Sequence, residues 1–325
     1  MKVAIIGCGL IGQKRAKALG DCQLVLCADL VKERAASLAQ QYKNCIATTD
    51  WHDAIKQPDI DIIIIATLHA TLAEIGLEAI HAGKHVFIEK PGARQASEIV
   101  PLLDATKNRS MRVKVGFNHR YHRAFRKARE LVDTNQLGEL MFIRARYGHG
   151  GRLGYDKEWR ANPLLSGGGE LIDQGVHLID LARWFLGDFT DVQGHAGTYY
   201  WNMPVDDNGF LLLKTPKKQV AFLHASSTEW KNLFSFEIYG RQGKIDIQGL
   251  GGSYGVERIT YYKMLPEMGP PETIAWEYPM ADDSWEKEFA DFVKCIKKNK
   301  PITAGLQDAH AALEIVEKIY RMSGL

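Results

Sequence analysis

The 325-residue sequence has no long apolar run, no excess of charge of one sign and no paired-cysteine pattern. Its longest apolar stretch, Ile60 to Leu68, is interrupted by Asp61 and is far too short to cross a bilayer. The formal net charge of +2 predicts no nucleic-acid partner and no membrane partner. Five cysteines, an odd number without CxxC spacing, indicate free thiols in a reducing cytoplasm. No cluster of metal-ligand residues stands out, so no metal is expected.

The composition, 46% hydrophobic and 25% charged residues, is typical of a globular protein, and the length allows two domains. The first third alternates apolar strand candidates such as Ile60 to Ala66 with helical stretches, which predicts an α/β domain. Consecutive strand candidates then run from Val192 to Tyr262. We therefore predict a Rossmann domain with a doubly wound parallel sheet in 1–118. Residues 119–325 are predicted to form an α+β domain on a large, mostly antiparallel sheet, with a C-terminal helix near 304–323 packing back on the first domain.

A glycine-rich turn directly follows the first strand candidate, Lys2 to Ile6, and precedes a helical stretch. In the turn Gly7-Cys8-Gly9-Leu10-Ile11-Gly12, the first glycine permits the tight turn and the second allows a pyrophosphate to approach. The third lets helix and strand pack closely. The helix start then offers free N–H groups to the phosphates. This order of strand, turn and helix predicts a dinucleotide site that includes Leu10 and Ile11.

An acidic residue ends the second strand candidate. Asp29 lies 17 residues after Gly12, near the spacing expected for a carboxylate that binds the ribose hydroxyls. It could equally cap the following helix, and both roles can hold at once. A carboxylate at this point repels the 2′-phosphate of NADP, and Leu30 offers no compensating cation. The sequence therefore predicts NAD rather than NADP.

Ligands of parallel sheets bind at the carboxyl ends of the strands. Several residues follow strand candidates and are predicted to lie on the cofactor side: Ala66, Thr67, Leu68, His69, Glu89, Lys90 and Asn118. Considered alone, Lys90 could be a surface lysine and Glu89 a salt-bridge partner.

A second dense motif, Ser166-Gly167-Gly168-Gly169-Glu170-Leu171-Ile172-Asp173-Gln174-Gly175-Val176-His177, leads into a predicted helix through Phe185. Three glycines let the backbone sit close to a ligand. Asp173 and His177 are four residues apart, so on a helix they share one face. As alternatives, His177 could be a satisfied helix histidine and Asp173 a structural cap or ion-pair partner.

With these motifs the chain resembles the Gfo/Idh/MocA oxidoreductases, the relatives of glucose–fructose oxidoreductase and inositol dehydrogenase. The resemblance rests on Gly7-x-Gly9-x-x-Gly12, on Ala82-Gly83-Lys84-His85-Val86-Phe87-Ile88-Glu89-Lys90-Pro91, on Trp159-Arg160 and on the GGG-x-L-x-D-x-G-x-H block. It covers the whole chain, and Glu-Lys-Pro followed at a distance by that block is a specific combination.

The resemblance implies a catalytic role for Lys90, Asp173 and His177. Lys90 would stabilise developing alkoxide charge on the reacting hydroxyl. His177 would be the general base or acid, since an imidazole titrates near neutral pH. Asp173 would position the substrate or orient His177. In the family the Lys-Pro bond is often cis, which would make Lys90–Pro91 a fixed turn.

The same resemblance predicts further residues that contact the cofactor or the substrate. Trp159 and Arg160 would contact the cofactor or the substrate, although Trp159 suits a hydrophobic core equally well. The chain enters the second domain at Arg120, Tyr121 and His122, which would line the substrate cleft with Asp173 and His177. Leu68 replaces a proline found in many relatives, and Leu72 or its neighbour replaces a histidine. By the resemblance, these departures would change contacts around the nicotinamide ribose but not the catalytic residues.

The resemblance implies an NAD(P)-dependent dehydrogenase that transfers a hydride between the nicotinamide and a hydroxyl-bearing carbon of a sugar, a cyclic polyol or a sugar derivative. The closest alternative is a nucleotide-sugar dehydrogenase of surface-glycan biosynthesis. An alternative from another class is a dinucleotide-binding sensor without turnover. Relatives associate through the second-domain sheet, so a homodimer or homotetramer is expected.

Overall fold

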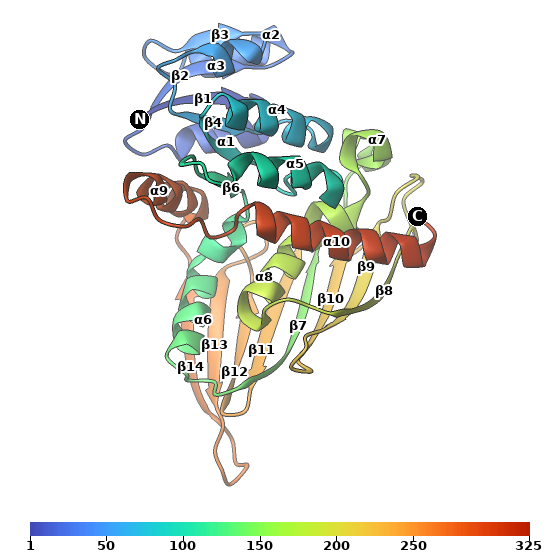
Figure 1. Cartoon of the computed structure of the whole chain (residues 1–325). Coiled ribbons are helices and arrows are strands. Elements are labelled where there is room, and N and C mark those ends of the chain that lie inside the picture. Colours follow the sequence, from blue (N-terminus) through green and yellow to red (C-terminus); the bar gives the residue numbers. More distant parts are fainter. The chain divides into compact units, whose positions relative to one another are not determined.

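The computed structural model describes residues 1–325, which divide into two compact units (Figure 1). The first comprises Met1–Phe117 and Trp285–Ala311, and the second Asn118–Ser284 and Ala312–Leu325. The sequence-based boundary gave 119–325 to the second domain and expected only the helix near 304–323 to pack back on the first, whereas residues 285–311 belong to the first unit. An amphipathic pattern shows that a helix has an apolar face but not which core covers that face.

The first unit is built on a six-stranded sheet in the order β3-β2-β1-β4-β5-β6, and every pairing in it is parallel. This order is typical of doubly wound dinucleotide-binding folds. The strands are β1 Lys2–Ile6, β2 Gln23–Ala28, β3 Ile46–Thr48, β4 Ile62–Ile65, β5 His85–Ile88 and β6 Val113–Val115. Every residue of the central strand β4 is buried, as expected of a parallel sheet whose two faces are covered by helices.

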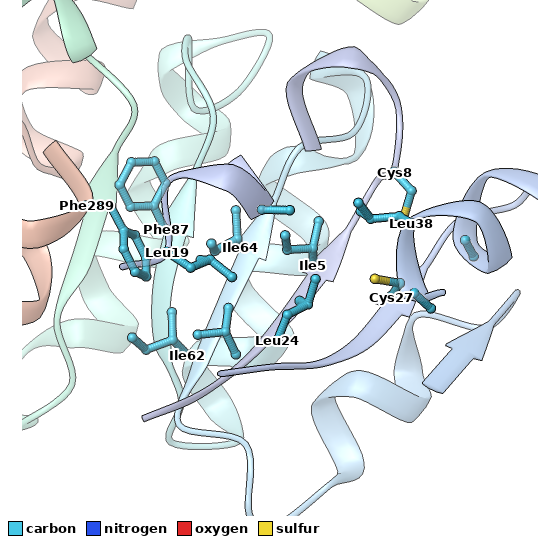
Figure 2. Close-up of a cluster of buried hydrophobic side chains, with 14 of the residues drawn as sticks. Ile5, Cys8, Leu19, Leu24, Cys27, Leu38, Ile62, Ile64, Phe87 and Phe289 are labelled. Carbon is cyan, nitrogen blue, oxygen red and sulfur yellow. The ribbon is translucent and has the colours of Figure 1, made fainter. Parts of the chain in front are cut away.

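The helices of this unit are α1 Leu10–Lys17, α2 Lys32–Ala39, α3 His52–Lys56, α4 His69–His81, α5 Ala96–Thr106 and α9 Ser284–Lys297, together with the first residues of α10 Leu306–Ser323. Figure 2 shows the cluster of buried side chains at its centre. Ile5, Ile64 and Phe87 lie side by side on the adjacent strands β1, β4 and β5, and α9 adds Phe289 and Phe292 to the same cluster. The late segment of the chain thus completes the core of the first unit.

The second unit contains an eight-stranded sheet in the order β14-β13-β12-β11-β7-β10-β9-β8. Only β7 and β10 pair in parallel, so the sheet is mostly antiparallel, and both parts of the predicted fold class are confirmed. The strands are β7 Leu140–Gly148, β8 Asp191–Gly197, β9 Asn208–Lys214, β10 Val220–Ser226, β11 Leu233–Gly240, β12 Gly243–Gln248, β13 Glu257–Lys263 and β14 Glu272–Tyr278.

Helices α6 and α8 lie against one face of this sheet (Figure 1). The helical segments of this unit are η1 Asn118–Tyr121, α6 Arg123–Asp133, η2 Tyr155–Lys157, η3 Trp159–Ala161, α7 Pro163–Ser166, the π-helical η4 Leu171–Gly175 and α8 Val176–Leu186. Side chains of the other face, among them Phe142, Leu212 and Phe222, are exposed. None of the helices in the chain combines the length and apolar composition needed to cross a membrane.

Candidate active site

The glycine-rich turn has the geometry that a dinucleotide requires. Gly7 has φ +92°, and a Cβ there would lie 2.4 Å from the carbonyl oxygen of Ala66. A Cβ on Gly12 would lie 1.9 Å from the Gly7 carbonyl oxygen, so helix α1 packs directly on the turn. A Cβ on Gly9 would meet nothing within 4 Å. The side of Gly9 is therefore open at the start of α1, where a pyrophosphate can approach the backbone N–H groups.

Asp29 directly follows β2, and its carboxylate is hydrogen-bonded to the glycine-rich turn. Its Oδ2 accepts the backbone N–H of Cys8 (2.8 Å), and its Oδ1 accepts that of Val31 (2.8 Å). The residue before α2 is Val31, so Asp29 makes a local turn rather than the helix cap itself. Each carboxylate oxygen has two acceptor sites, so each keeps one for a ribose hydroxyl. Leu30, the next side chain, is 88% exposed.

The loop after β4 also borders the carboxyl edge of the sheet. Ala66, Thr67 and Leu68 are half-buried, and His69 is buried at the first position of α4. The Thr71 hydroxyl donates to the Thr67 hydroxyl (2.9 Å), which fixes the turn into the helix. Leu72 is fully buried in the core, so this departure from the family pattern serves packing.

Glu89, at the end of β5, is an ion-pair partner. It accepts a hydrogen bond from Nε of the fully buried Arg15, whose Nη1 donates to Glu288 of α9 (2.8 Å). The Arg15 guanidinium lies between the rings of Phe87 and Trp285, 4.2 and 4.3 Å from their centroids. Burial raises the pKa of Glu288, whereas the charge of Arg15 opposes that shift. The predicted contact of Glu89 with the cofactor stays a prediction, and its structural role is to hold the strand end that precedes Lys90.

Lys90 is half-buried and follows Glu89 at the carboxyl edge of the first unit's sheet. The Lys90–Pro91 peptide bond is cis, as the family resemblance implied. The lysine therefore occupies the edge where ligands of doubly wound sheets bind.

In the second unit the GGG-x-L-x-D-x-G-x-H motif does not form one continuous α-helix. Residues Leu171–Gly175 make a π-helical turn, and α8 begins at Val176. Single π turns within helices are frequent at functional sites. Asp173 in this turn is buried and accepts a hydrogen bond from Arg160 Nε (2.9 Å). The charge of Asp173 raises the pKa of Arg160, and the Arg160 guanidinium also lies 4.6 Å from the Trp159 ring centroid.

His177, in the first turn of α8, is buried and stacks on a second imidazole. Its ring lies 3.7 Å from that of His119, centroid to centroid, with an interplanar angle of 18°. The buried ring of Tyr147 meets His177 edge-on at 6.3 Å, and burial raises the pKa of Tyr147 well above its usual value. His119 and Tyr147 are absent from the residues predicted by sequence, because neither belongs to a recognisable motif.

Two glycines of the motif, Gly168 and Gly169, pack closely against other parts of the second unit. A Cβ on Gly168 would lie 2.3 Å from the Tyr320 hydroxyl, and one on Gly169 would lie 1.8 Å from the Asp206 carbonyl oxygen. The buried carboxylate of Asp206 accepts the N–H groups of Gly169 and Leu171 (2.8 Å each) and the Tyr320 hydroxyl (2.7 Å). These contacts fix the segment that leads to Asp173.

A buried carboxylate that sequence reasoning missed lies three residues before Asp173. Glu170 accepts the Tyr155 hydroxyl (3.2 Å) and faces His149 Nε2 (3.4 Å), while its Oε1 is buried without a hydrogen-bond partner. Nδ1 of His149 accepts the Gly151 N–H (2.9 Å), so the proton of the neutral ring sits on Nε2. Burial lowers the pKa of His149, but the Glu170 carboxylate overrides this and raises it. The only available signal was the position of Glu170 inside the motif.

Several residues predicted to line the site have structural partners in the second unit. Arg120 forms a bidentate ion pair with Asp180 of α8, and both are buried. His122 Nδ1 lies 3.0 Å from Glu257, and the Asn118 side chain donates to Ser284 (3.0 Å). Tyr121 is half-buried at the end of η1. No group of three or more His, Cys, Asp or Glu side chains is arranged to hold a metal ion.

Comparison with known proteins matches both halves of the chain. A family profile described as "Oxidoreductase family, NAD-binding Rossmann fold" matches residues 1–117, and the "GFO/IDH/MocA C-terminal domain" profile matches residues 125–246. The chain is 26% identical to levoglucosan dehydrogenase of Pseudarthrobacter phenanthrenivorans, over 75% of this chain and 73% of that protein. It is 25% identical to scyllo-inositol 2-dehydrogenase (NAD(+)) of Bacillus subtilis, over 97% and 92% of the two chains.

Among solved structures, levoglucosan dehydrogenase in complex with NADH superposes with a TM-score of 0.88, at 24% identity, covering 99% of this chain and 98% of that one. This likeness shows that the fold is shared. The glycine turn, the Lys90 strand end and the Asp173–His177 segment occur in the order that the family resemblance implied. With its two profiles matching both halves, the chain belongs to the Gfo/Idh/MocA family of NAD-dependent oxidoreductases.

Proposed function

We propose that this protein is a dehydrogenase of a sugar or cyclic polyol, in which Lys90, Asp173 and His177 act on one hydroxyl group. The observation that carries the proposal is the setting of His177, a buried imidazole beside a π turn that also holds the ion-paired Asp173. The substrate class is supported by the relatives, which are named levoglucosan dehydrogenase and inositol dehydrogenases. When bound, NAD accepts or supplies the hydride.

The three side chains have distinct roles in this proposal. His177 takes the hydroxyl proton during oxidation and returns it during reduction. Lys90, as an ammonium, donates a hydrogen bond to the same oxygen and stabilises its developing negative charge. Asp173, held by Arg160, keeps a fixed carboxylate next to the substrate hydroxyls. Lys90 belongs to the first unit and His177 to the second, so the proposal requires both to reach the same hydroxyl.

Cellular location and assembly also belong to this proposal. All five cysteines are free thiols, which supports the cytoplasmic location predicted from the sequence. The open face of the second-unit sheet exposes Phe142, Leu212 and Phe222, which is apolar surface that a second copy of the chain could cover. We therefore propose a homodimer or homotetramer formed through this face.

Turnover with a defined panel tests the proposal. The purified chain is incubated with NAD and levoglucosan, inositols, aldoses or UDP-glucose, and NADH absorbance is followed. We expect reduction of NAD with at least one sugar or polyol. The Lys90→Met variant should then lose about 10²–10³-fold in turnover, with NADH affinity unchanged in calorimetry. Lys107→Met, which changes an exposed lysine of the same unit, is the matched control. Turnover retained in Lys90→Met would contradict the role of Lys90, and no turnover with any compound would contradict the proposed activity.

A further inference from the structure

Three loops of the second unit present aromatic side chains at one end of its sheet. They follow β7, β8 and β10, whose last residues lie side by side through the pairings of Gly148 with Ser226 and of Asn208 with both Ser226 and Gly197. The exposed fractions of Tyr200 and Trp230 are 57% and 69%. Large apolar side chains that gather at one exposed place usually mark a binding surface.

The rings form a continuous series that leads to the candidate active site. Tyr200 and Trp230 meet edge to face, with centroids 4.8 Å apart and planes at 83°, so together they make an open corner. Tyr200 meets Trp201 at 5.1 Å, and Trp201 meets Tyr155 at 5.5 Å. Tyr155 then donates its hydroxyl to Glu170, three residues before Asp173.

A buried carboxylate holds the loop that carries these rings. Asp207 is fully buried and accepts the backbone N–H groups of Tyr199 (2.9 Å), Tyr200 (2.7 Å) and Trp201 (3.0 Å). The indole N–H of Trp201 donates to the carbonyl oxygen of Ser227 (3.0 Å). Buried charges are found where hydrogen bonds satisfy them, so Asp207 holds the backbone of this loop in place while the rings of Tyr199 and Tyr200 stay exposed.

The backbone around Trp230 is also unusual. Trp230 has φ +59°, a left-handed conformation that is a genuine outlier for so bulky a residue. A Cβ on Gly150 would lie 2.9 Å from the Trp230 backbone, and one on Gly151 would lie 2.3 Å from the Trp201 ring. Glycines thus make room for both tryptophans. Folding gains little from an indole that stays mostly exposed, and strained residues of this kind cluster at ligand sites.

Two consecutive aspartates, Asp206 and Asp207, connect the Tyr199–Trp201 loop to the segment Gly169–Leu171, which leads to Asp173. Asp206 holds the N–H groups of Gly169 and Leu171, and Asp207 holds the Tyr199–Trp201 loop. Because both carboxylates are buried and hydrogen-bonded, they connect the backbone of the Tyr199–Trp201 loop to the segment that leads to Asp173. That is the arrangement expected of a second binding position for the same substrate.

We propose that Tyr200 and Trp230 form a stacking platform for an additional ring of a substrate that contains two or more sugar rings. This inference rests on the proposed function and names its substrate class as uncharged glycosides. The C–H faces of a sugar ring pack well on aromatic faces. A nucleotide would bring a diphosphate that needs cations. Arg152, in the neighbouring loop, is already paired with Glu158 (2.8 Å), and the loop that carries Lys231 also carries the acidic Glu229, so it adds no net positive charge.

The test compares sugars with one and two rings. Binding of glucose, maltose, cellobiose, sucrose, trehalose and UDP-glucose to the NADH-loaded full chain is measured by calorimetry, and the molar mass of each variant is measured by light scattering. We expect at least one disaccharide to bind about tenfold more tightly than glucose. Trp230→Ala and Tyr200→Ala should abolish this advantage without changing glucose affinity. Tyr199→Ala is the matched control, because its equally exposed ring packs near Phe210 instead and should leave the advantage intact.

The outcomes separate the platform from the proposed function. If no disaccharide binds more tightly than glucose, or if Trp230→Ala keeps the advantage, the platform is refuted even though polyols are oxidised. If UDP-glucose alone loses affinity in the variants, the ligand is a nucleotide and the glycoside assignment is overturned. If the variants change only the molar mass in light scattering, the rings contact a second copy. Disaccharide binding that depends on Trp230, without oxidation of any sugar, supports the platform and refutes the dehydrogenase.

Discussion

Removing the charge of Asp29 should change cofactor choice by an amount that follows from its hydrogen bonds. Each oxygen of this carboxylate accepts one backbone N–H at 2.8 Å and keeps one acceptor site for a ribose hydroxyl. A hydrogen bond to a charged acceptor contributes about 1.5–3 kcal/mol. A 2′-phosphate would instead place about two negative charges near the carboxylate, which costs a similar amount at the effective dielectric of a protein surface.

We therefore expect the unmodified chain to bind NADH about ten- to a hundredfold more tightly than NADPH, or about 1.4–3 kcal/mol. Asp29→Asn keeps the shape of the side chain and removes the repulsion. NADH affinity should fall by about tenfold or more, and the gap between the two cofactors should close. In Asp29→Asn the side-chain NH₂ group also replaces an oxygen that accepts the backbone N–H of Cys8 or of Val31. One of these two hydrogen bonds is lost, so the first unit should lose about 1–3 kcal/mol of stability.

The assay is calorimetric titration with NADH and NADPH, accompanied by thermal unfolding without cofactor to measure the stability loss separately. Asp21→Asn, an exposed aspartate of the same unit, is the matched control and should change neither quantity. Equal or tighter binding of NADPH by the unmodified chain would refute the reasoning. The exposed side chains of Lys32 or Arg34, at the start of α2, would then hold the phosphate.

Three further predictions concern the second unit. His177→Asn should remove the rise of the oxidation rate with pH, and an unchanged pH–rate profile would reassign the base. Phe222→Asp, on the open sheet face, should give a monomer in light scattering, and a chain that is monomeric before substitution would contradict assembly through this face. Burial raises the pKa of Asp206 from 3.8 to about 6, so the folded chain keeps a proton between these values that the unfolded chain has lost. The free energy of unfolding should thus fall by up to about 3 kcal/mol as the pH rises through this window, measured in urea, and Asp206→Asn should lack that slope.

The sequence predicted the first unit well because its signals are local. Strands β1, β4 and β5 are nearly continuous apolar runs, and Gly7 and Gly83 mark the turns beside β1 and β5, so a parallel sheet follows from the pattern. The three-residue strand β3, Ile46–Thr48, was not predicted because it is too short and too exposed to show a pattern. β14 was not predicted. Residues Glu272–Tyr278 are mostly exposed at the sheet edge, so no buried face imposes an alternating pattern on them.

The π turn that holds Asp173 could not be predicted either. Residues 171–186 have the composition of one helix, and the spacing of Asp173 and His177 suggested a shared helical face. The π turn follows a segment whose N–H groups at Gly169 and Leu171 are held by Asp206, 37 and 35 residues later in the sequence. Such distant hydrogen bonds have no periodic signature. The stacking of His177 on His119 is non-local for the same reason.

Asp29 and Glu89 both lie at strand ends, but their hydrogen bonds leave them different capacities for a ligand. Asp29 makes two structural hydrogen bonds yet keeps acceptor capacity at a partly exposed edge, so a structural and a cofactor role are compatible. Glu89 is buried against an arginine that is itself fully buried and shared with Glu288. Removing one partner of such a group leaves an uncompensated charge, which is far more destabilising than the loss of one surface contact. A carboxylate at a strand end is therefore a strong candidate for ligand binding only where its charge is not already required to balance a buried cation. Sequence alone cannot show this at Glu89, because Arg15 and Glu288 lie 74 residues before it and 199 residues after it.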